Sequence, residues 1–309
     1  MKRPRREAAG LRPCALIMNM SARKAISPNQ RACILCGGGS FDEYSPGLRR
    51  CRGCGFVSAD LNLSEEEHRA LYARQYFFGT EYRDYVADRQ EHQRNFRLRL
   101  DVLDRFLEPS RHRHLLEIGS AFGFFLELAR ERFETVRGLD VSAEGTEFAR
   151  ARGLEVSNQD FLTAPLAVPP PDVVCLWDVL EHLREPHLYL EKIAAEIAPG
   201  GLVALTTGDI GSVNARLRGR RWRLIHPPTH LNYFSRRTIA AMLDKYGFDI
   251  LYDRYCGFYR SVDGMAWGIL ALRAGVPSLH RLLRRMGLLQ WDLYLNLFDI
   301  TYVIARKRR

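Results

Sequence analysis

Short apolar runs alternate with helical stretches from residue 114 onward, and this alternation restricts the fold of the 309-residue chain more than any other feature. Seven runs have the length and composition of strands: 114–118, 135–139, 154–157, 172–177, 202–207, 248–254 and 300–305. Helical patterns lie between them, at 124–132, 143–152, 187–197 and 238–246. Strands that alternate with helices form a mostly parallel sheet with helices on both faces. The sequence therefore predicts an α/β, Rossmann-like sheet of seven strands.

The first predicted strand leads into a turn of small residues at the start of a helix. Gly119, Ala121 and Gly123 occupy the first, third and fifth positions of this turn. Small residues there let the backbone approach a ligand at a helix N-terminus. A dinucleotide-binding fingerprint needs a small residue at the sixth position, where this chain has Phe124. The spacing therefore argues against a dinucleotide cofactor.

Polar residues follow two other predicted strands. Asp140 ends the second strand, 23 residues after Glu117, where a carboxylate can accept hydrogen bonds from both hydroxyls of a ribose. Trp177 and Asp178 end the fourth strand, at the edge where open α/β sheets bind ligands. An ordinary strand-end aspartate is the alternative interpretation of Asp140.

In this order the motifs resemble those of the class I S-adenosylmethionine (SAM)-dependent methyltransferases. The resemblance implies that Glu117 contacts the methionine end of SAM and that the small-residue turn wraps around the cofactor. It also implies that Asp160 accepts a hydrogen bond from the adenine amino group while Phe161 packs on the ring; an exposed loop acid is the alternative for Asp160. The cofactor-binding residues expected on these grounds are Glu117, Gly119, Ala121, Gly123, Asp140, Val141, Asp160, Phe161, Trp177 and Asp178.

Four of the seven cysteines form two C-x-x-C pairs in front of this region. The pairs are Cys33 with Cys36 and Cys51 with Cys54, separated by 14 residues. Two such pairs at about this interval can place four thiolates around one Zn²⁺ ion, and a closed four-cysteine site is structural. The sequence predicts a small zinc ribbon, with a pair of redox dithiols as the alternative.

The candidate catalytic residues lie mainly in the stretch 222–235, which contains two histidines and a tyrosine. Together with the cysteine pairs, this stretch resembles a bacterial family of zinc-ribbon methyltransferases that includes deoxysugar C-methyltransferases. The resemblance implies that His230 is the general base; a histidine that only orders the loop or contacts the cofactor is the alternative. His182 is the second candidate base because Asp178 and Glu181 are near it in sequence. His226 and Tyr233 are candidate substrate contacts.

Four segments describe the expected domain organisation. We expect a disordered basic tail over 1–30, a zinc ribbon over 31–58, a helical linker or lid over 59–110, and a methyltransferase domain over 111–309 with a helical insertion at about 256–298. In the linker, Ser64 and Glu67 have the spacing of a capping box. The apolar face of the insertion could belong to the core or a lid, to a dimer surface, or to a patch that contacts a membrane surface.

The charge distribution bears on the partners of the chain. The net charge is +10, of which +6 lies in residues 1–30 and +4 in the last four residues. Residues 31–305 therefore have a net charge of zero, and the excess positive charge lies in the two tails. This distribution argues against a nucleic-acid-binding face on the folded part of the chain. No apolar run is long enough to span a membrane, and no signal peptide is evident, so we expect a cytoplasmic protein, either a monomer or a homodimer.

These features together predict a SAM-dependent methyltransferase with a small-molecule acceptor, saccharide-like or related to natural products or the cell envelope. Whether carbon, oxygen or nitrogen receives the methyl group stays open. Two alternatives also stay open: a methyltransferase that uses the ribbon and the basic tails on RNA or protein, and a SAM-binding scaffold without catalysis.

Overall fold

The computed structural model describes residues 32–72, 76–80, 84–165 and 167–308. The chain divides into two compact units, 1–31 and 32–309, and all described residues belong to the second. The basic tail expected over 1–30 therefore lies outside the described residues.

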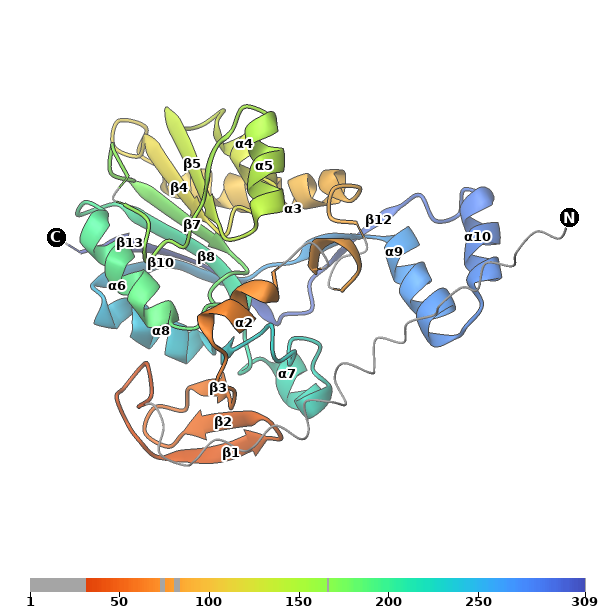
Figure 1. Ribbon diagram of the computed structural model, residues 1–309, viewed down its shortest axis with the longest axis horizontal. Helices are drawn as coiled ribbons and strands as arrows, with labels where there is room; N and C mark the ends of the chain where they lie inside the picture. Colours follow the sequence, from red (N-terminus) through yellow and green to blue (C-terminus); the bar gives the residue numbers. More distant parts are fainter. Residues whose placement is uncertain (1–31, 73–75, 81–83, 166, 309) are drawn as a thin grey trace, which may run out of the picture. The chain divides into compact units, whose positions relative to one another are not determined.

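A seven-stranded sheet forms the centre of the second unit (Figure 1). Its strands are β4 (His114–Ile118), β5 (Thr135–Asp140), β6 (Glu155–Asn158), β7 (Val173–Trp177), β8 (Leu202–Gly208), β10 (Phe248–Tyr255) and β13 (Ile300–Lys307). Their order is β10-β13-β8-β7-β4-β5-β6. Strand β13 pairs antiparallel with β8 and β10, and the pairings from β8 to β6 are parallel. The prediction of a mostly parallel seven-stranded sheet is confirmed.

Side chains along the central strands alternate between two apolar layers. Leu115 and Cys175 pack in one cluster with helix α3 (Arg89–Leu103). Leu116 and Val174 pack in the other cluster with helices α6 (Pro186–Glu196) and α8 (Arg236–Lys245). Successive residues of a strand point to opposite faces, so a run that is apolar throughout can be buried on both sides. This explains why the sequences of these strands are continuously apolar and do not alternate between apolar and polar residues.

Helices cover both faces of the sheet. Figure 1 shows α4 and α5 on one face and α6 and α8 on the other. The helices of this unit are α2 (Glu65–Ala70), α3 (Arg89–Leu103), α4 (Phe124–Ala129), α5 (Ala143–Ala151), α6 (Pro186–Glu196), α7 (Val213–Arg218), α8 (Arg236–Lys245), α9 (Val262–Ala266) and α10 (Pro277–Arg285), with short 3-10 turns at Asp104–Phe106 and Gly219–Arg221 and π-helical turns at Tyr76–Thr80 and Trp267–Arg273. Helix α2 begins with the predicted capping box of Ser64 and Glu67.

The path of the chain through the sheet fixes where a ligand can bind. After β4 the chain runs outward through β5 to β6, and then returns to β7 on the other side of β4. Loops that leave β4 and β7 at their carboxyl ends therefore diverge, and the crevice between them is the usual ligand site of such sheets. The turn from Gly119 and the residues after Trp177 both lie at this edge.

A second, four-stranded sheet contains the paired-cysteine region. It consists of β1 (Phe41–Ser45), β2 (Leu48–Cys51), β3 (Val57–Ala59) and, from far along the chain, β9 (Asn232–Tyr233). The stretch 222–235 was expected to be a loop, and the structure shows that its end joins the ribbon sheet. Val57 pairs with Tyr233, and the Ala59 amide donates to the Leu231 carbonyl at 2.8 Å.

Two expectations for the C-terminal part need correction. The insertion at 256–298 is not purely helical, because β11 (Phe258–Ser261) and β12 (Asp292–Leu295) pair antiparallel at its two ends. The basic C-terminus is also not a free tail. Arg306 and Lys307 belong to β13, and the Arg308 guanidinium contacts Asp249 at 2.7 Å. The C-terminal residues are held in place because β13 pairs with both β8 and β10.

Within the part of the chain that the structure describes, no helix has both the length and the apolar character needed to cross a membrane.

Candidate active site

A cavity of about 450 Å³ occupies the crevice at the carboxyl edge of the sheet. One part of its wall comes from the sheet edge, including Gly119, Asp140 and Asp178. Another part comes from residues that precede the sheet, including Tyr72 and Arg99, and from the stretch that contains His230. Three separate segments of the chain therefore enclose one space.

The small-residue turn has the backbone geometry that the sequence pattern predicts for close approach to a ligand. Gly119 and Gly123 have φ angles of +77° and +75°, and Ala121 between them also has a positive φ of +45°. The Asp140 carboxylate accepts hydrogen bonds from the amides of Ala121 and Ser142, both at 2.7 Å. Each carboxylate oxygen has two lone pairs, so Asp140 holds the turn and retains acceptor capacity toward the cavity.

Gly119→Ala is expected to weaken SAM binding and to destabilise the fold. A Cβ at Gly119 would lie 2.5 Å from Val179 Cγ2, and the φ of +77° adds about 1–2 kcal/mol of backbone strain. Gly153→Ala is the matched control, since its φ is +76° and a Cβ there meets nothing within 4 Å. Calorimetric SAM titration and urea unfolding should show that only Gly119→Ala lowers SAM affinity, while both variants lose stability. Equal SAM affinities would contradict the assignment of this turn.

Most of the expected cofactor residues line the cavity together. These are Gly119, Ala121, Asp140, Val141, Asp160, Phe161, Trp177 and Asp178. Gly123 lies behind the turn, against Leu154. Glu117 is buried at the end of β4 outside the cavity wall. Asp160 already accepts a 2.7 Å hydrogen bond from the Tyr189 hydroxyl, which fixes its carboxylate beside the cavity.

Three buried polar atoms in or near the turn have no hydrogen-bond partner among the described residues. They are Glu117 Oε2, Ser120 Oγ and Trp177 Nε1. Burial, and then the nearby Asp140 carboxylate, raises the pKa of Glu117 well above its usual value. Unpaired buried polar groups in and behind the wall of a crevice fit a polar ligand that supplies the missing hydrogen bonds.

An ion pair and a buried carboxyl group surround the middle of the cavity. Arg99 from α3 donates to the Asp178 carboxylate at 2.8 Å and lies over the Trp177 ring. Asp178 itself has a positive φ of +54°, so its backbone is held in a conformation that costs about 1 kcal/mol or more. Burial, and then the Asp178 charge, raises the pKa of Glu181 to about 8. Glu181 Oε2 accepts from the Thr207 hydroxyl at 2.9 Å.

His182 and His230 face each other with ring centres 4.6 Å apart. His182 Nδ1 contacts the Thr229 carbonyl at 3.0 Å, and His230 Nδ1 contacts the Leu224 carbonyl at 2.9 Å. A carbonyl only accepts, so each Nδ1 carries the proton and each Nε2 has a lone pair. Among the described residues, neither Nε2 receives a hydrogen bond. Both residues line the cavity, and the Nε2 of each ring can accept a proton or bind a metal ion.

The other two candidate catalytic residues occupy different places. His226 lines the cavity, and its Nδ1 contacts the Thr229 hydroxyl at 2.6 Å. Tyr233 does not reach the cavity: it is buried in β9, and its hydroxyl donates to the His230 carbonyl at 3.0 Å. Tyr233 is therefore placed to hold the backbone of His230.

The side chains of Glu181, His182 and His230 also form a compact group. One ligand atom from each lies within 4.8 Å of the others, close enough to hold a cation. The same three groups can instead serve proton transfer, because two are unprotonated bases and the third is a raised-pKa acid.

Acid is expected to destabilise the protein through two cavity histidines. Burial lowers the pKa of both His92 and His230 to about 4, below the ordinary value of 6.5. A folded-state pKa below the unfolded value means that the stability is present above pH 6.5 and is lost as pH falls toward 4. Each histidine should remove roughly 2 kcal/mol of unfolding free energy between pH 7 and pH 5. Urea unfolding at both pH values measures the loss, and His92→Gln should reduce it by roughly 2 kcal/mol; an unchanged loss would contradict the assignment.

Several cavity residues were not singled out from the sequence. Glu91, Asn95 and Arg99 lie at intervals of four on α3 and share one helix face. This spacing was the available signal, but nothing in it indicated what the face would meet. Arg223 and Arg260 also line the cavity, and both guanidiniums lie over the Phe258 ring, at 5.5 and 4.9 Å.

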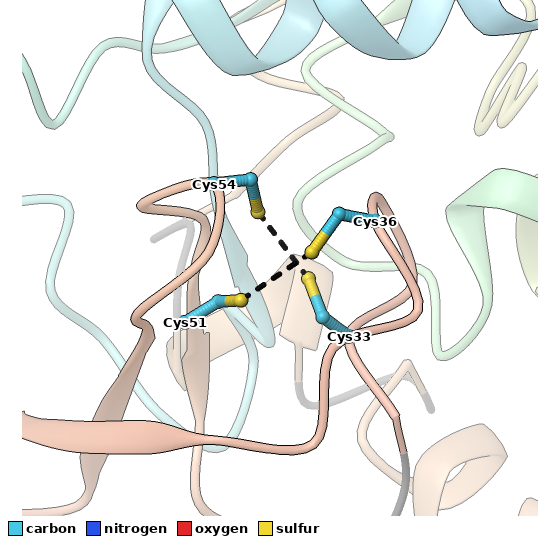
Figure 2. A group of neighbouring side chains, drawn as sticks. All are labelled: Cys33, Cys36, Cys51 and Cys54. Atoms are coloured by element: carbon cyan, nitrogen blue, oxygen red, sulfur yellow. Dashed lines mark hydrogen bonds between the residues drawn. The ribbon is translucent and has the colours of Figure 1, made fainter.

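The four paired cysteines converge at the end of the ribbon. Figure 2 shows their sulfur atoms pointing toward one another. The Sγ atoms of Cys33 and Cys54 are 3.5 Å apart, as are those of Cys36 and Cys51, and one ligand atom from each of the four lies within 4.8 Å of the others. A tetrahedron with Zn–S bonds of about 2.3 Å has S···S edges of roughly 3.8 Å. The donor set and its dimensions therefore fit one zinc ion.

The sheet order, the small-residue turn and the cavity at the switch point define the class of this protein: a Rossmann-like, SAM-dependent methyltransferase. Residues 88–252 match the family model described as a methyltransferase domain. This match covers more than half of the chain, and the chain belongs to that family. Membership implies SAM as the methyl donor.

Similarity to curated and solved proteins agrees with this membership. The chain is 27% identical over 117 residues to a ubiquinone biosynthesis O-methyltransferase of Nitrosomonas europaea, which covers 36% of this chain and 50% of the relative. It is 32% identical over 100 residues to the protein of the same name from Klebsiella pneumoniae, covering 30% of this chain and 41% of the relative. The chain thus spans about half the length of the curated relatives it matches.

Among solved structures, a chain in a complex of the Haloferax volcanii Trm112 methyltransferase activator with a methyltransferase is similar in fold. Its TM-score is 0.51 at 15% identity, and the match covers 80% of this chain and all of that one.

Proposed function

We propose that this chain transfers a methyl group from SAM to a hydroxyl of a small-molecule acceptor, with His230 as the base that takes the hydroxyl proton. The observation that carries the proposal is the anchored His230 ring, which keeps an unprotonated Nε2 and lines the same cavity as the small-residue turn. When bound, SAM supplies an electrophilic methyl group on sulfur. The residues of this chain then hold the acceptor hydroxyl in line with the methyl–sulfur bond and remove its proton.

Burial keeps His230 unprotonated before reaction. Burial lowers the pKa of His230 to about 4, while the Asp178 charge acts in the opposite direction. The imidazole is therefore neutral at pH 7, and the nearby carboxylate stabilises the imidazolium that forms on proton transfer. The Leu224 carbonyl fixes the tautomer, and the Tyr233 hydroxyl holds the backbone of His230.

The other residues that line the cavity near the histidines favour a polar acceptor of modest size. Tyr72 and Tyr76 present aromatic surface beside His182, and Arg223 and Arg260 add hydrogen-bond donors. Aromatic faces next to polar donors suit a saccharide or a hydroxylated natural product, including a cell-envelope precursor. The names of the curated relatives, which are O-methyltransferases, support oxygen as the atom that is methylated.

A structural zinc ion in the four-cysteine site completes the proposal. Cys33, Cys36, Cys51 and Cys54 would hold it, and it would supply a cross-link that the short ribbon needs in place of a larger core.

The test is incubation of the purified protein with methyl-labelled SAM and fractionated small molecules, lipids, RNA and protein, followed by mass spectrometry. We expect label in a polar small molecule and an ether methyl in its fragmentation pattern. His230→Gln run in parallel should bind SAM and leave that product unlabelled. Label confined to RNA or protein would overturn the proposal.

A further inference from the structure

Helix α10 in the C-terminal insertion exposes the apolar face that a helix normally buries. Leu279, Leu282 and Met286 recur at intervals of three and four and therefore share one side of the helix. They are 42%, 54% and 61% exposed. His280 is the buried residue of α10, and its Nε2 contacts Asp263 at 2.9 Å. His280 thus attaches the helix to α9, and the Trp267 ring packs against the same imidazole.

The opposite side of α10 is basic. Arg281, Arg284 and Arg285 lie there, all of them exposed. The whole insertion, 256–298, has five arginines and two aspartates, a net charge of +3. Exposed apolar residues continue past the helix with Leu288 and Trp291. An exposed apolar face beside arginines, with a tryptophan close by, is the composition of helices that lie in a membrane interface.

The insertion that contains α10 is also connected to the wall of the cavity. Strand β11, which precedes α9, contributes Phe258 and Arg260 to that wall. Asn95 of α3 exchanges two hydrogen bonds with the backbone of Tyr259, and Glu91 accepts from the Ser261 amide at 2.8 Å. Figure 1 shows α9 and α10 beyond the strand β12, which pairs with β11.

We propose that α10 is a docking site for an anionic membrane surface. The leucines and Met286 would insert at the boundary between headgroups and acyl chains, while the three arginines would contact anionic headgroups. The proposal is independent of the acceptor and of the methyl-transfer reaction.

Charge favours a membrane over a second copy of the chain as the occupant. In a symmetric dimer the apolar patch would meet its own copy, and the three arginines on the other side of each helix would take no part in the contact. An anionic surface is complementary to the positive charge of the arginines as well as to the apolar side.

The test compares full-chain variants in co-sedimentation with vesicles of pure phosphatidylcholine and of phosphatidylcholine mixed with phosphatidylserine. Leu282→Glu with Met286→Glu removes the apolar face, and both positions are exposed, so the fold should persist. Leu217→Glu on α7 is the matched control, an 82% exposed leucine on another arginine-bearing helix. A third variant, with Arg281, Arg284 and Arg285 all changed to Gln, tests the basic side.

We expect binding of the unaltered chain to the mixed vesicles and little binding to the neutral ones. The Leu282 and Met286 double variant should lose roughly 100-fold in partitioning, and the triple arginine variant about fivefold per arginine. Leu217→Glu should bind as the unaltered chain does. Equal binding by the double variant and the Leu217 control would overturn the proposal. A dimer by light scattering that the double variant dissociates, with vesicle binding unchanged, would replace it with a self-association surface.

Discussion

Replacing His230 with glutamine is expected to reduce kcat by roughly 10²- to 10⁴-fold, the usual contribution of a positioned general base. Glutamine can still donate to the Leu224 carbonyl, but it has no basic nitrogen to receive the proton from the acceptor. SAM affinity should change little, because the cofactor turn from Gly119 lies on a different segment of the chain. Single-turnover assays with labelled SAM, together with calorimetric SAM titration, measure the two quantities separately.

Two matched variants distinguish proton transfer by His230 from other roles of the cavity side chains around it. His226→Gln changes a neighbouring cavity histidine and should reduce kcat by less than about tenfold. Glu181→Gln resembles the protonated carboxyl that the raised pKa of about 8 maintains at neutral pH, so activity should be largely kept. If Glu181→Gln were as inactive as His230→Gln, a cation held by these side chains would explain the site better than a base.

The sequence predicted the sheet and the cofactor turn well because both depend on local patterns. A run such as that of β7 is apolar at every position, and a strand buried on both faces needs this composition. Gly119 and Gly123 have positive φ angles that other residues adopt at a cost, so their positions are visible in the sequence. The ends of the central strands consequently lie within three residues of the predicted ones.

The part of the cavity around Asp178 and His230 could not be predicted in the same way, because it depends on contacts between segments that are distant in the sequence. Arg99 and Asp178 are 79 residues apart, and the helical pattern around Arg99 does not indicate which acid it meets. Tyr233 belongs to a two-residue strand, too short to produce a periodic pattern. The hydrogen bond from its hydroxyl to the His230 carbonyl depends on the pairing of β9 with β3, which no local pattern indicates.

That pairing makes the ribbon a direct neighbour of the proposed base. The Ala59 amide donates to Leu231, the residue after His230, and the Arg237 guanidinium donates to the Cys54 carbonyl. On the other side, the amides of Leu231 and Asn232 both donate to the Glu181 carbonyl. The segment that follows His230 is therefore fixed between the ribbon and the loop after β7. Loss of the ribbon should release one of these two attachments.

Removing one zinc ligand, as in Cys51→Ser, is accordingly expected to reduce kcat on the order of 10²-fold, the scale of effect that small misplacements of a catalytic group produce. SAM affinity should stay within about twofold, because the cofactor turn is built on β4 and β5. The purified variant should contain no zinc by elemental analysis, and hydrogen exchange should rise in 230–234. The unaltered chain should contain one zinc ion.

Two further variants separate zinc binding from the strand pairing that it supports. Ala59→Pro keeps all four thiols but removes the donor to Leu231, so zinc should remain while kcat falls as in Cys51→Ser. Gly39→Ala should retain both zinc and activity, since a Cβ there meets nothing within 4 Å and its φ is not positive. Full activity in a zinc-free protein would show that the ribbon does not position His230. If Ala59→Pro kept full activity while Cys51→Ser lost it, the zinc site would act on the cavity by a route other than β9.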